Sequence, residues 1–273
     1  MEEQFIRAYR KTATVIKAFK ELLGRKKINF PSMKKNEDLV IICNGPSVKN
    51  CEEKIRSHGD VDYMCVNFFP STSELFETLQ PRFICMVDAG FYNGTNKAED
   101  IKKLKAKLEN VEWQMFFIQM KNQNLNIQNE KIVRIPLSTN IYSDKITGTI
   151  DWLFKKNLAT VPYWTVANTA LFVATLMKYE NVYIYGIDMS MFKNFYIDDN
   201  NHLVTIEKHY YGEKKMDYSA EYQSVMEGGI EHMFDSQLQA FHSFNMIRDF
   251  AKRNQVKIFN CTPGSYVDSF ERI

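Results

Sequence analysis

The feature that most limits the fold of this chain is a series of short, nearly continuous apolar runs. The first is Leu39-Val40-Ile41-Ile42-Cys43, and others of the same kind follow along the chain. An apolar run without alternation predicts a strand that is buried on both faces, as in a parallel sheet covered by helices on each side. The predicted strands are 39–43, 62–67, 82–87, 113–118, 131–136, 181–186 and 256–260.

Segments with helical spacing separate many of these strands. The spacing predicts helices at 48–58, 71–79, 97–109, 166–179 and 229–254. Alternation of strands and helices predicts an α/β fold with a mostly parallel, doubly wound, Rossmann-like sheet. Ligands of such sheets bind beyond the carboxyl ends of the strands, so we expect the chemistry to lie there.

Polar side chains stand where the predicted strands end: Asn44, Asn67, Asp88 and, after Gly186-Ile187, Asp188. An asparagine offers both a donor and an acceptor, which suits ribose hydroxyls, a phosphate oxygen or a pyrimidine edge. Asparagine is also common as a cap or turn residue at a strand-to-helix junction. Both interpretations remain open for Asn44 and Asn67.

A tight turn, Asn44-Gly45-Pro46-Ser47, follows the first strand. Ser47 opens the next predicted helix, and the N-terminus of that helix would favour a phosphate or a carboxylate. No lysine follows the turn, and no G-x-G-x-x-G is present, so the turn is neither a Walker-type phosphate loop nor a dinucleotide fingerprint.

The stretch 188–228 breaks the alternation of strands and helices. It is rich in aromatic, charged and turn residues without periodicity, and we expect it to form a lid or a small subdomain. Its tyrosines either donate hydrogen bonds to a leaving phosphate or pack within the lid; they are Tyr196, Tyr210 and Tyr211. The run 198–201, Asp-Asp-Asn-Asn, lacks the spacing of a calcium loop and is more typical of a turn between two short strands.

An enzyme that activates a hydroxyl needs a base that titrates near neutrality, and histidine supplies one. His209 lies beside two tyrosines of the expected lid, and His232 lies near the start of the long predicted helix. Glu213, just beyond Tyr211-Gly212, is a carboxylate alternative.

The composition argues against several classes of protein, namely membrane-spanning, secreted and zinc- or disulfide-containing proteins. The 273 residues are 45% hydrophobic, enough for a sizeable core, and no apolar run reaches the roughly 18 residues of a membrane span. We expect no secretory signal, because charged residues replace an apolar segment near the start. The five cysteines form no C-x-x-C pair, which predicts reduced, buried thiols of a cytoplasmic protein and argues against a zinc site or disulfides.

The first part of the chain is strongly basic. Residues 1–35 hold ten Lys or Arg against three Glu, a net charge of about +7, and their apolar residues have helical spacing. Such a helix either lies on an anionic membrane surface, through residues 1–28, or packs on the domain or a partner protein. It lacks the interleaved aromatics of a nucleic-acid site. We therefore expect a basic helix and linker over 1–37 and one domain over 38–273.

Several of these segments together resemble a known family. Residues 40–47, 65–67, 182–188 and 209–212 resemble the bacterial sialyltransferases of the Campylobacter lipooligosaccharide type, glycosyltransferase family 42. The resemblance runs from about residue 39 to the C-terminus. It implies a Rossmann-like, GT-A-like domain with a lid, a CMP-sugar donor, inversion at the anomeric carbon, and no metal.

The resemblance also implies roles for single residues. Asn44 matches an asparagine that contacts donor phosphate and ribose, with Gly45 and Ser47 in the same turn, and Asn67 matches a second donor-binding asparagine. Asp88 falls where the family has another asparagine, and Asn168 falls near a serine that binds the donor. Further donor-site candidates are Asp188, Tyr210 and Tyr211.

Not every family residue that contacts the leaving phosphate or acts as the base has an identical residue at the matching position of this sequence. Tyr196 aligns with one of two tyrosines that hydrogen-bond the phosphate, and the other falls on Ser190. The family's catalytic histidine falls on Glu213 in a literal match, and on His232 if the gap is placed differently, which leaves His209 as a lid residue.

Three hypotheses follow. The first is an inverting, metal-independent glycosyltransferase that moves sialic acid or a related ulosonic acid, such as Kdo, from a CMP-sugar to an oligosaccharide or lipid-linked acceptor. It would serve lipopolysaccharide or capsule synthesis in the cytoplasm, peripherally at the membrane, as a monomer or homo-oligomer. The second is a Mg²⁺-dependent, pterin diphosphokinase-like phosphotransferase. The third is a non-catalytic, membrane-associated assembly protein.

Overall fold

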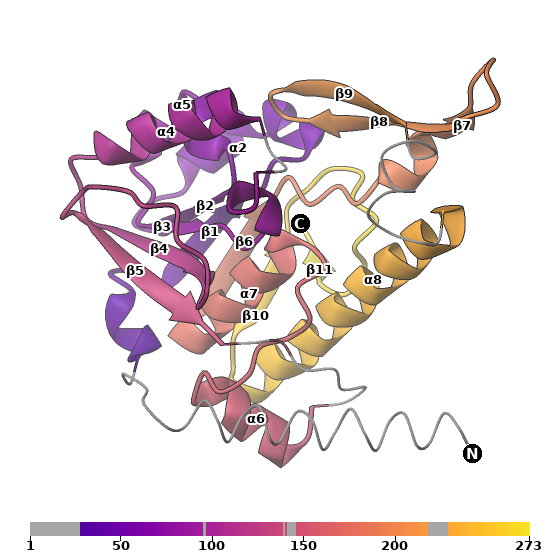
Figure 1. Ribbon diagram of the computed structural model, residues 1–273. Helices are drawn as coiled ribbons and strands as arrows, with labels where there is room; N and C mark the ends of the chain where they lie inside the picture. The colour runs from indigo at the N-terminus through magenta and orange to yellow at the C-terminus, as the bar shows by residue number, and fades with distance from the viewer. Residues whose placement is uncertain (1–27, 95–96, 139, 141–145, 218–228) are drawn as a thin grey trace.

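A single parallel sheet organises the protein (Figure 1). The structure is a computed structural model, and it describes residues 28–94, 97–138, 140, 146–217 and 229–273. The strand order is β11-β10-β6-β1-β2-β3-β4-β5, and each neighbouring pair is parallel. The strands are β1 Asp38–Ile42, β2 Asp62–Val66, β3 Phe83–Cys85, β4 Met115–Met120, β5 Ile132–Leu137, β6 Asn181–Tyr185, β10 Lys257–Asn260 and β11 Glu271–Arg272. The predicted doubly wound α/β fold is confirmed.

Helices cover both faces of this sheet, as the continuous apolar strands require. In β1, Leu39 and Ile41 belong to the core on one face, and Val40 and Ile42 belong to the core on the other. The helices are η1 Phe30–Met33, η2 Pro46–Asn50, α2 Glu52–Ser57, α3 Phe69–Thr72, α4 Leu75–Leu79, η3 Ala89–Phe91, α5 Ala98–Glu109, α6 Gly148–Lys155, α7 Val166–Met177, η4 Met191–Asn194 and α8 Gly229–Arg253.

Helices α7 and α8 lie side by side on the first face and run in the same direction. Asn168 Nδ2 of α7 donates to the carbonyl oxygen of Ala240 over 3.4 Å, and further along both helices Phe172 stacks on Phe250. Both helices precede a parallel strand of the sheet, so both begin at the carboxyl edge. The first turn of α7 therefore packs against α8 near Ala240, at the edge of the sheet where a ligand is expected.

The stretch after β6 is more regular than predicted. It forms a three-stranded antiparallel sheet of β7 Phe195–Ile197, β8 Leu203–His209 and β9 Gly212–Asp217, drawn in orange in Figure 1. The predicted turn at Asp198 is confirmed, because the Asp198 side chain accepts hydrogen bonds from the amides of Asn200 and His202, each 3.0 Å long. The chain then leaves β9 toward α8.

Two predicted helices are each divided in the structure. The expected helix 48–58 consists of η2 followed by α2, since Cys51 interrupts the helical geometry. The expected helix 71–79 is broken at Ser73, which is extended and whose hydroxyl accepts from the amide of Leu75. Helix α6 and strand β11 were not predicted at all.

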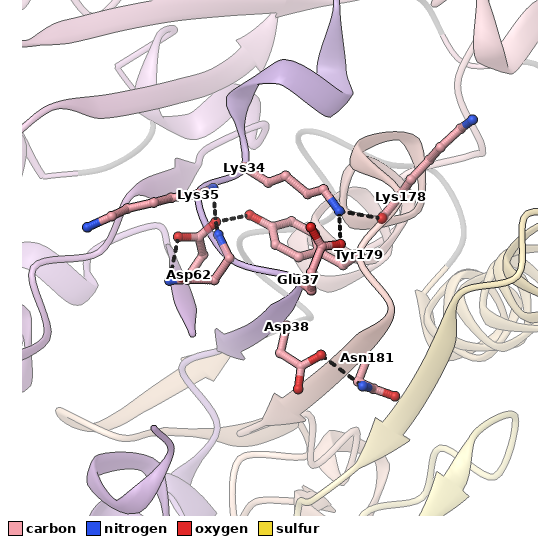
Figure 2. A network of polar contacts seen from close by, with 9 residues as sticks. Lys34, Lys35, Glu37, Asp38, Asp62, Lys178, Tyr179 and Asn181 are labelled. Atoms are coloured by element: carbon pink, nitrogen blue, oxygen red, sulfur yellow. Dashed lines mark hydrogen bonds and ion pairs between the residues drawn. The ribbon is translucent and has the colours of Figure 1, made fainter. Parts of the chain in front are cut away.

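At the amino edge of the sheet, a buried carboxylate organises a polar network (Figure 2). Asp62 accepts hydrogen bonds from the Lys35 amide (2.8 Å), from Asn36 and from the Tyr179 hydroxyl (2.6 Å). Lys34 pairs with Glu37 and donates to the carbonyl oxygen of Lys178. The segment leading into β1 is thereby fixed to the start of β2 and to the turn before β6.

The predictions for the cysteines, the basic helix and membrane-spanning segments have different outcomes. All five cysteines are buried and free, as predicted, and burial raises the pKa of the Cys43 thiol to about 12. The expected basic helix falls almost wholly outside the described residues, although Phe30 and Met33 of the expected linker are buried in η1. None of the described helices has the length and apolarity needed to cross a membrane.

Candidate functional site

A cavity of about 720 Å³ opens at the carboxyl edge of the sheet. Its walls come from the ends of β1, β2, β3 and β6, from the starts of α7 and α8, and from the three-stranded sheet. This is the place where parallel α/β sheets hold their ligands. The four polar residues predicted at the strand ends all line it: Asn44, Asn67, Asp88 and Asp188.

Asn44 and Asn67 occupy matching positions on neighbouring strands. Ile42 pairs with Cys65 in the parallel register, and each asparagine follows two residues later. Asn44 donates through Nδ2 to the carbonyl oxygen of Val66 over 3.3 Å. Among the described residues, nothing donates to Asn44 Oδ1 or to Asn67 Oδ1, although both oxygens are buried. Buried amide oxygens without donors are uncommon in proteins, so this pair indicates a ligand that donates hydrogen bonds.

Asn67 also has an unusual backbone. Its φ is +50°, in the left-handed region that residues other than glycine seldom enter. The Asn67 amide donates to the carbonyl oxygen of Cys85 on β3 over 3.2 Å, which fixes this turn against the next strand. Asparagine adopts this conformation more readily than most residues, which suits it to the turn at the end of β2.

The turn after β1 is locked to the end of β6. Gly45 donates its amide to the carbonyl oxygen of Gly186 over 3.0 Å. Ser47 donates from its hydroxyl (2.7 Å) and from its amide (3.3 Å) to the Asp188 carboxylate. Burial raises the pKa of Asp188, and the hydrogen bonds from Ser47 oppose that shift.

This arrangement gives Ser47 a different role from the one predicted. Its hydroxyl is engaged with Asp188, Ser47 is not among the cavity-lining residues, and it opens only a five-residue 3₁₀ helix. We therefore interpret Ser47 as a residue that positions Asp188. Gly45 lines the cavity, as the donor-site prediction requires, but its contact with a donor stays a prediction.

The three-stranded sheet contributes a histidine and a carboxylate to the cavity. Glu207 and His209 share one face of β8, with Glu207 Oε2 lying 3.8 Å from His209 Nε2. The His209 ring stacks on Tyr211 with ring centroids 5.1 Å apart. Burial raises the pKa of Tyr211 to about 12, so its hydroxyl is a hydrogen-bond donor at neutral pH.

Of the three candidate bases, the structure brings only His209 to the cavity. His232 lies near the start of α8 and is not a lining residue. Glu213 lies on β9, is exposed and pairs with Lys208 at 3.4 Å. The structure thus favours His209, which the literal family match leaves without a catalytic role.

Two other predicted residues, Asn168 and Tyr196, also stay away from the cavity wall. Asn168 is fully buried, and its amide group completes a capping box with Thr165 at the start of α7, so its side chain has no free surface for a donor. Tyr196 lies on β7, exposed and off the wall, whereas Ser190, at the position of the second family tyrosine, does line the cavity.

Tyr210 connects the two sheets. Its amide donates to the carbonyl oxygen of Asn44 over 2.8 Å, and its hydroxyl donates to Glu52 Oε1 over 2.8 Å. Its ring packs beside Phe69 in the core of the main domain. We therefore interpret Tyr210 as a structural link that positions His209 and Tyr211, in place of the predicted donor contact.

Some cavity residues were missed from the sequence. Glu207 was missed, although it alternates with the predicted His209 along a strand, a signal that was available once 203–209 is read as a strand. Trp164 and Gln237 carry no such signal, because they come from the entrance of α7 and from the middle of a long amphipathic helix. Only the tertiary fold brings them to the site.

Cation ligands do not cluster in the part of the chain that the structure describes. There, no group of three or more His, Cys, Asp or Glu side chains is placed to hold a metal ion. Asp88, exposed in the cavity, instead accepts a hydrogen bond from the amide of Gly90 over 2.8 Å and caps η3. Whether the reaction uses a metal therefore stays a prediction.

Comparison with known proteins gives similarity only at the level of solved structures. No protein-family model and no curated protein sequence matches this chain. The chain is similar to the sialyltransferase CstII from Campylobacter jejuni in complex with cytidine-5'-monophosphate, with 15% identity over 86% of this chain and 84% of that chain and a TM-score of 0.44.

Two further structures of that enzyme match in the same way. The complex of CST-II with a trisaccharide acceptor and CMP has 14% identity over 86% of this chain and 85% of that chain, with a TM-score of 0.46. The complex with CMP-3FNeuAc has 13% identity and a TM-score of 0.45. These are the same class of enzyme that the sequence motifs resemble. Likenesses this distant do not establish a shared activity, which has to come from the side chains of the cavity.

Proposed function

We propose that this protein is an inverting glycosyltransferase that moves a sugar from a CMP-sugar donor to a glycan hydroxyl. The donated sugar is sialic acid or a related ulosonic acid, and no metal takes part. The proposal combines the family resemblance of the strand-end motifs with the chemistry of the cavity they line. Its finer parts, namely a lipopolysaccharide or capsule acceptor and contact with a membrane through residues 1–28, rest on the sequence alone.

One observation carries the proposal: two buried amide oxygens without donors, Asn44 Oδ1 and Asn67 Oδ1, lie on adjacent strand ends. Neighbouring strands are separated by about 4.8 Å, a spacing that a ribose with two hydroxyl donors can bridge. The exocyclic amine of cytosine is a further donor of the right kind. A nucleoside bound here would relieve the cost of leaving both oxygens unsatisfied.

His209, a lining residue from the three-stranded sheet, supplies the base. In the proposed step, His209 accepts the proton of the acceptor hydroxyl, whose oxygen forms a bond to the anomeric carbon of the donor sugar. The bond between that carbon and the phosphate oxygen breaks at the same time, and CMP leaves with the electron pair. Attack opposite the leaving group inverts the anomeric centre.

Glu207 and Tyr211 assist this step from the same segment. The Glu207 carboxylate lies 3.8 Å from Nε2 of His209, so its negative charge stabilises the imidazolium that forms when His209 accepts the proton. Tyr211 is a neutral phenol at the cavity wall and can donate a hydrogen bond to the leaving phosphate. This assigns to Tyr211 the contribution that the sequence match gave to Tyr196.

The three-stranded sheet is then the lid of the active site. It carries Glu207, His209 and Tyr211 and is joined to the main domain through Tyr210. Closure of this lid on the donor would exclude water and limit hydrolysis of the activated sugar.

A ligand panel tests the proposal directly. We expect CMP to raise the melting temperature of the intact protein in the presence of EDTA, and CDP, UDP, GDP and ATP to do so less or not at all. Replacing Asn67 with Ala should reduce the CMP shift, whereas replacing Asn126, a left-handed surface residue away from the cavity, should not. If ATP raises the melting temperature only in the presence of Mg²⁺, the phosphotransferase hypothesis is favoured instead. If no nucleotide changes the melting temperature, the hypothesis of a non-catalytic assembly protein is favoured.

A further inference from the structure

A second pair of buried polar atoms lines the same cavity, on its helical wall. Trp164 Nε1 and Gln237 Oε1 are both buried, and neither has a hydrogen-bond partner among the described residues. By contrast, the indole of Trp113 is satisfied, since its Nε1 donates to the carbonyl oxygen of Pro81 over 2.9 Å. Each unsatisfied group lowers the stability of the free protein, so a pair of them in a cavity calls for an explanation.

The packing of α7 on α8 explains why these two residues share one wall. Asn168 bonds to Ala240, and the helices run in the same direction from that point. Trp164 lies four residues before Asn168, and Gln237 lies three residues before Ala240. Both therefore sit at the end of the helix pair that faces the carboxyl edge of the sheet, on a different wall from His209 of the lid.

The two atoms have opposite hydrogen-bonding character, which defines the ligand. The indole N–H only donates, and the amide oxygen only accepts. An anion would satisfy the indole but be repelled by the amide oxygen, and a cation would do the reverse. A neutral hydroxyl accepts from one and donates to the other. The indole ring also offers an apolar surface of the kind that packs against sugar C–H groups.

We propose that Trp164 and Gln237 form a subsite for a neutral sugar hydroxyl, on the donated sugar or on the acceptor glycan. This inference deepens the proposed function, and it assigns binding of the sugar to the α7/α8 wall and binding of the nucleotide to the strand ends.

The subsite predicts an unusual combination of effects. Trp164→Phe keeps an aromatic ring without the N–H, and Gln237→Met keeps the side-chain length without the amide. Each removes an unsatisfied buried atom, so the free protein should melt at the same temperature or about 2 °C higher. A merely structural role for either side chain predicts a lower melting temperature.

The binding measurements use the intact protein with CMP, CMP-3FNeuAc and lactose as probes. Both variants should bind CMP as the wild type does. They should bind CMP-3FNeuAc or lactose about three- to tenfold more weakly, the loss expected for one hydrogen bond. Weakening of CMP-3FNeuAc assigns the hydroxyl to the donated sugar, and weakening of lactose assigns it to the acceptor.

Matched controls are Trp152→Phe, at an exposed site on α6, and Gln239→Met, whose amide bonds to Asp235 on the surface of α8. Neither control should change any of the three affinities. The subsite is overturned if Trp164→Phe and Gln237→Met leave both sugar probes unaffected, or if they weaken CMP equally. If the wild-type protein binds lactose but not CMP, the proposed function is wrong, but the proposed sugar subsite is not contradicted.

Discussion

The absence of a side chain at position 45 allows the turn after β1 to close on β6. A methyl group there would lie 1.9 Å from Asp188 Oδ2 and 2.5 Å from the carbonyl oxygen of Gly186. We predict that Gly45→Ala lowers the free energy of unfolding by about 1–3 kcal/mol, the usual cost of overpacking. Urea denaturation measures this loss. Gly59→Ala, where a methyl group meets nothing within 4 Å, should be nearly neutral, and an equal loss in both variants would refute the explanation.

His209 is the residue whose removal should affect catalysis most. We predict that His209→Ala lowers kcat by about 10²–10⁴-fold, the contribution expected of a general base, and that added imidazole restores part of it. Glu207→Gln should cause a smaller loss. The measurement is the rate at which sugar is transferred from CMP-sialic acid to an oligosaccharide acceptor.

His202→Ala is the matched control for the base. His202 lies on the same three-stranded sheet, but its Nδ1 pairs with Asp217 at 3.0 Å and it does not line the cavity. It should keep nearly full activity. If His232→Ala abolishes activity and His209→Ala does not, the assignment of the base is wrong.

At the scale of elements, the attachment of the three-stranded sheet depends on Tyr210. We predict that Tyr210→Phe and Glu52→Gln each destabilise the protein and that a double-mutant cycle gives a coupling of about 1 kcal/mol, because the two side chains share one hydrogen bond. Hydrogen exchange at the amides of β8 should speed up in both variants. Strict additivity would show that the bond contributes nothing.

The sequence predicts some elements better than others, for physical reasons. Strands such as β1 and β6 were found because burial on both faces leaves an uninterrupted apolar run. The three-stranded sheet was missed because its residues are only partly buried and its strands carry charges, for example Glu207 and Lys208. Helix α6 was missed because it is short and its sequence lacks a long periodic pattern.

The same reasoning explains what was predictable in the site. Asn44 and Asn67 could be identified because a strand end is a local feature and parallel strands bring their ends together. The choice of His209 over His232 and Glu213 needed the tertiary structure, since all three are equally plausible bases in the sequence. Asn168 shows the converse case. It is a polar residue at the carboxyl edge of the sheet, but its side chain caps the start of α7.

On the scale of the whole molecule, the two edges of the main sheet differ in how their polar groups are satisfied. At the amino edge, Asp62 accepts several hydrogen bonds within the protein (Figure 2). At the carboxyl edge, Asn44 and Asn67 keep acceptors without donors. The first pattern stabilises the fold, and the second costs stability in the free protein.

This contrast predicts separable effects at the two edges. Asp62→Asn replaces an acceptor by a donor facing other donors, so it should lower the free energy of unfolding by about 1–3 kcal/mol and leave CMP affinity unchanged. Thermal unfolding and calorimetry measure the two quantities. Asp38→Asn, which affects one contact with Asn181, should cost less. A change of CMP affinity in Asp62→Asn would show that the two edges are not independent.

Asn44 takes part in two contacts with different consequences. Its carbonyl oxygen accepts a hydrogen bond from the amide of Tyr210, and its buried side-chain oxygen has no donor among the described residues. A nucleotide that binds more tightly when the Tyr210 contact is formed must strengthen that contact by the same free energy, since linkage between two sites is reciprocal. Under the proposed function, Asn44 would couple the position of the lid to occupancy by the donor, so that release of CMP and loosening of the lid would favour each other.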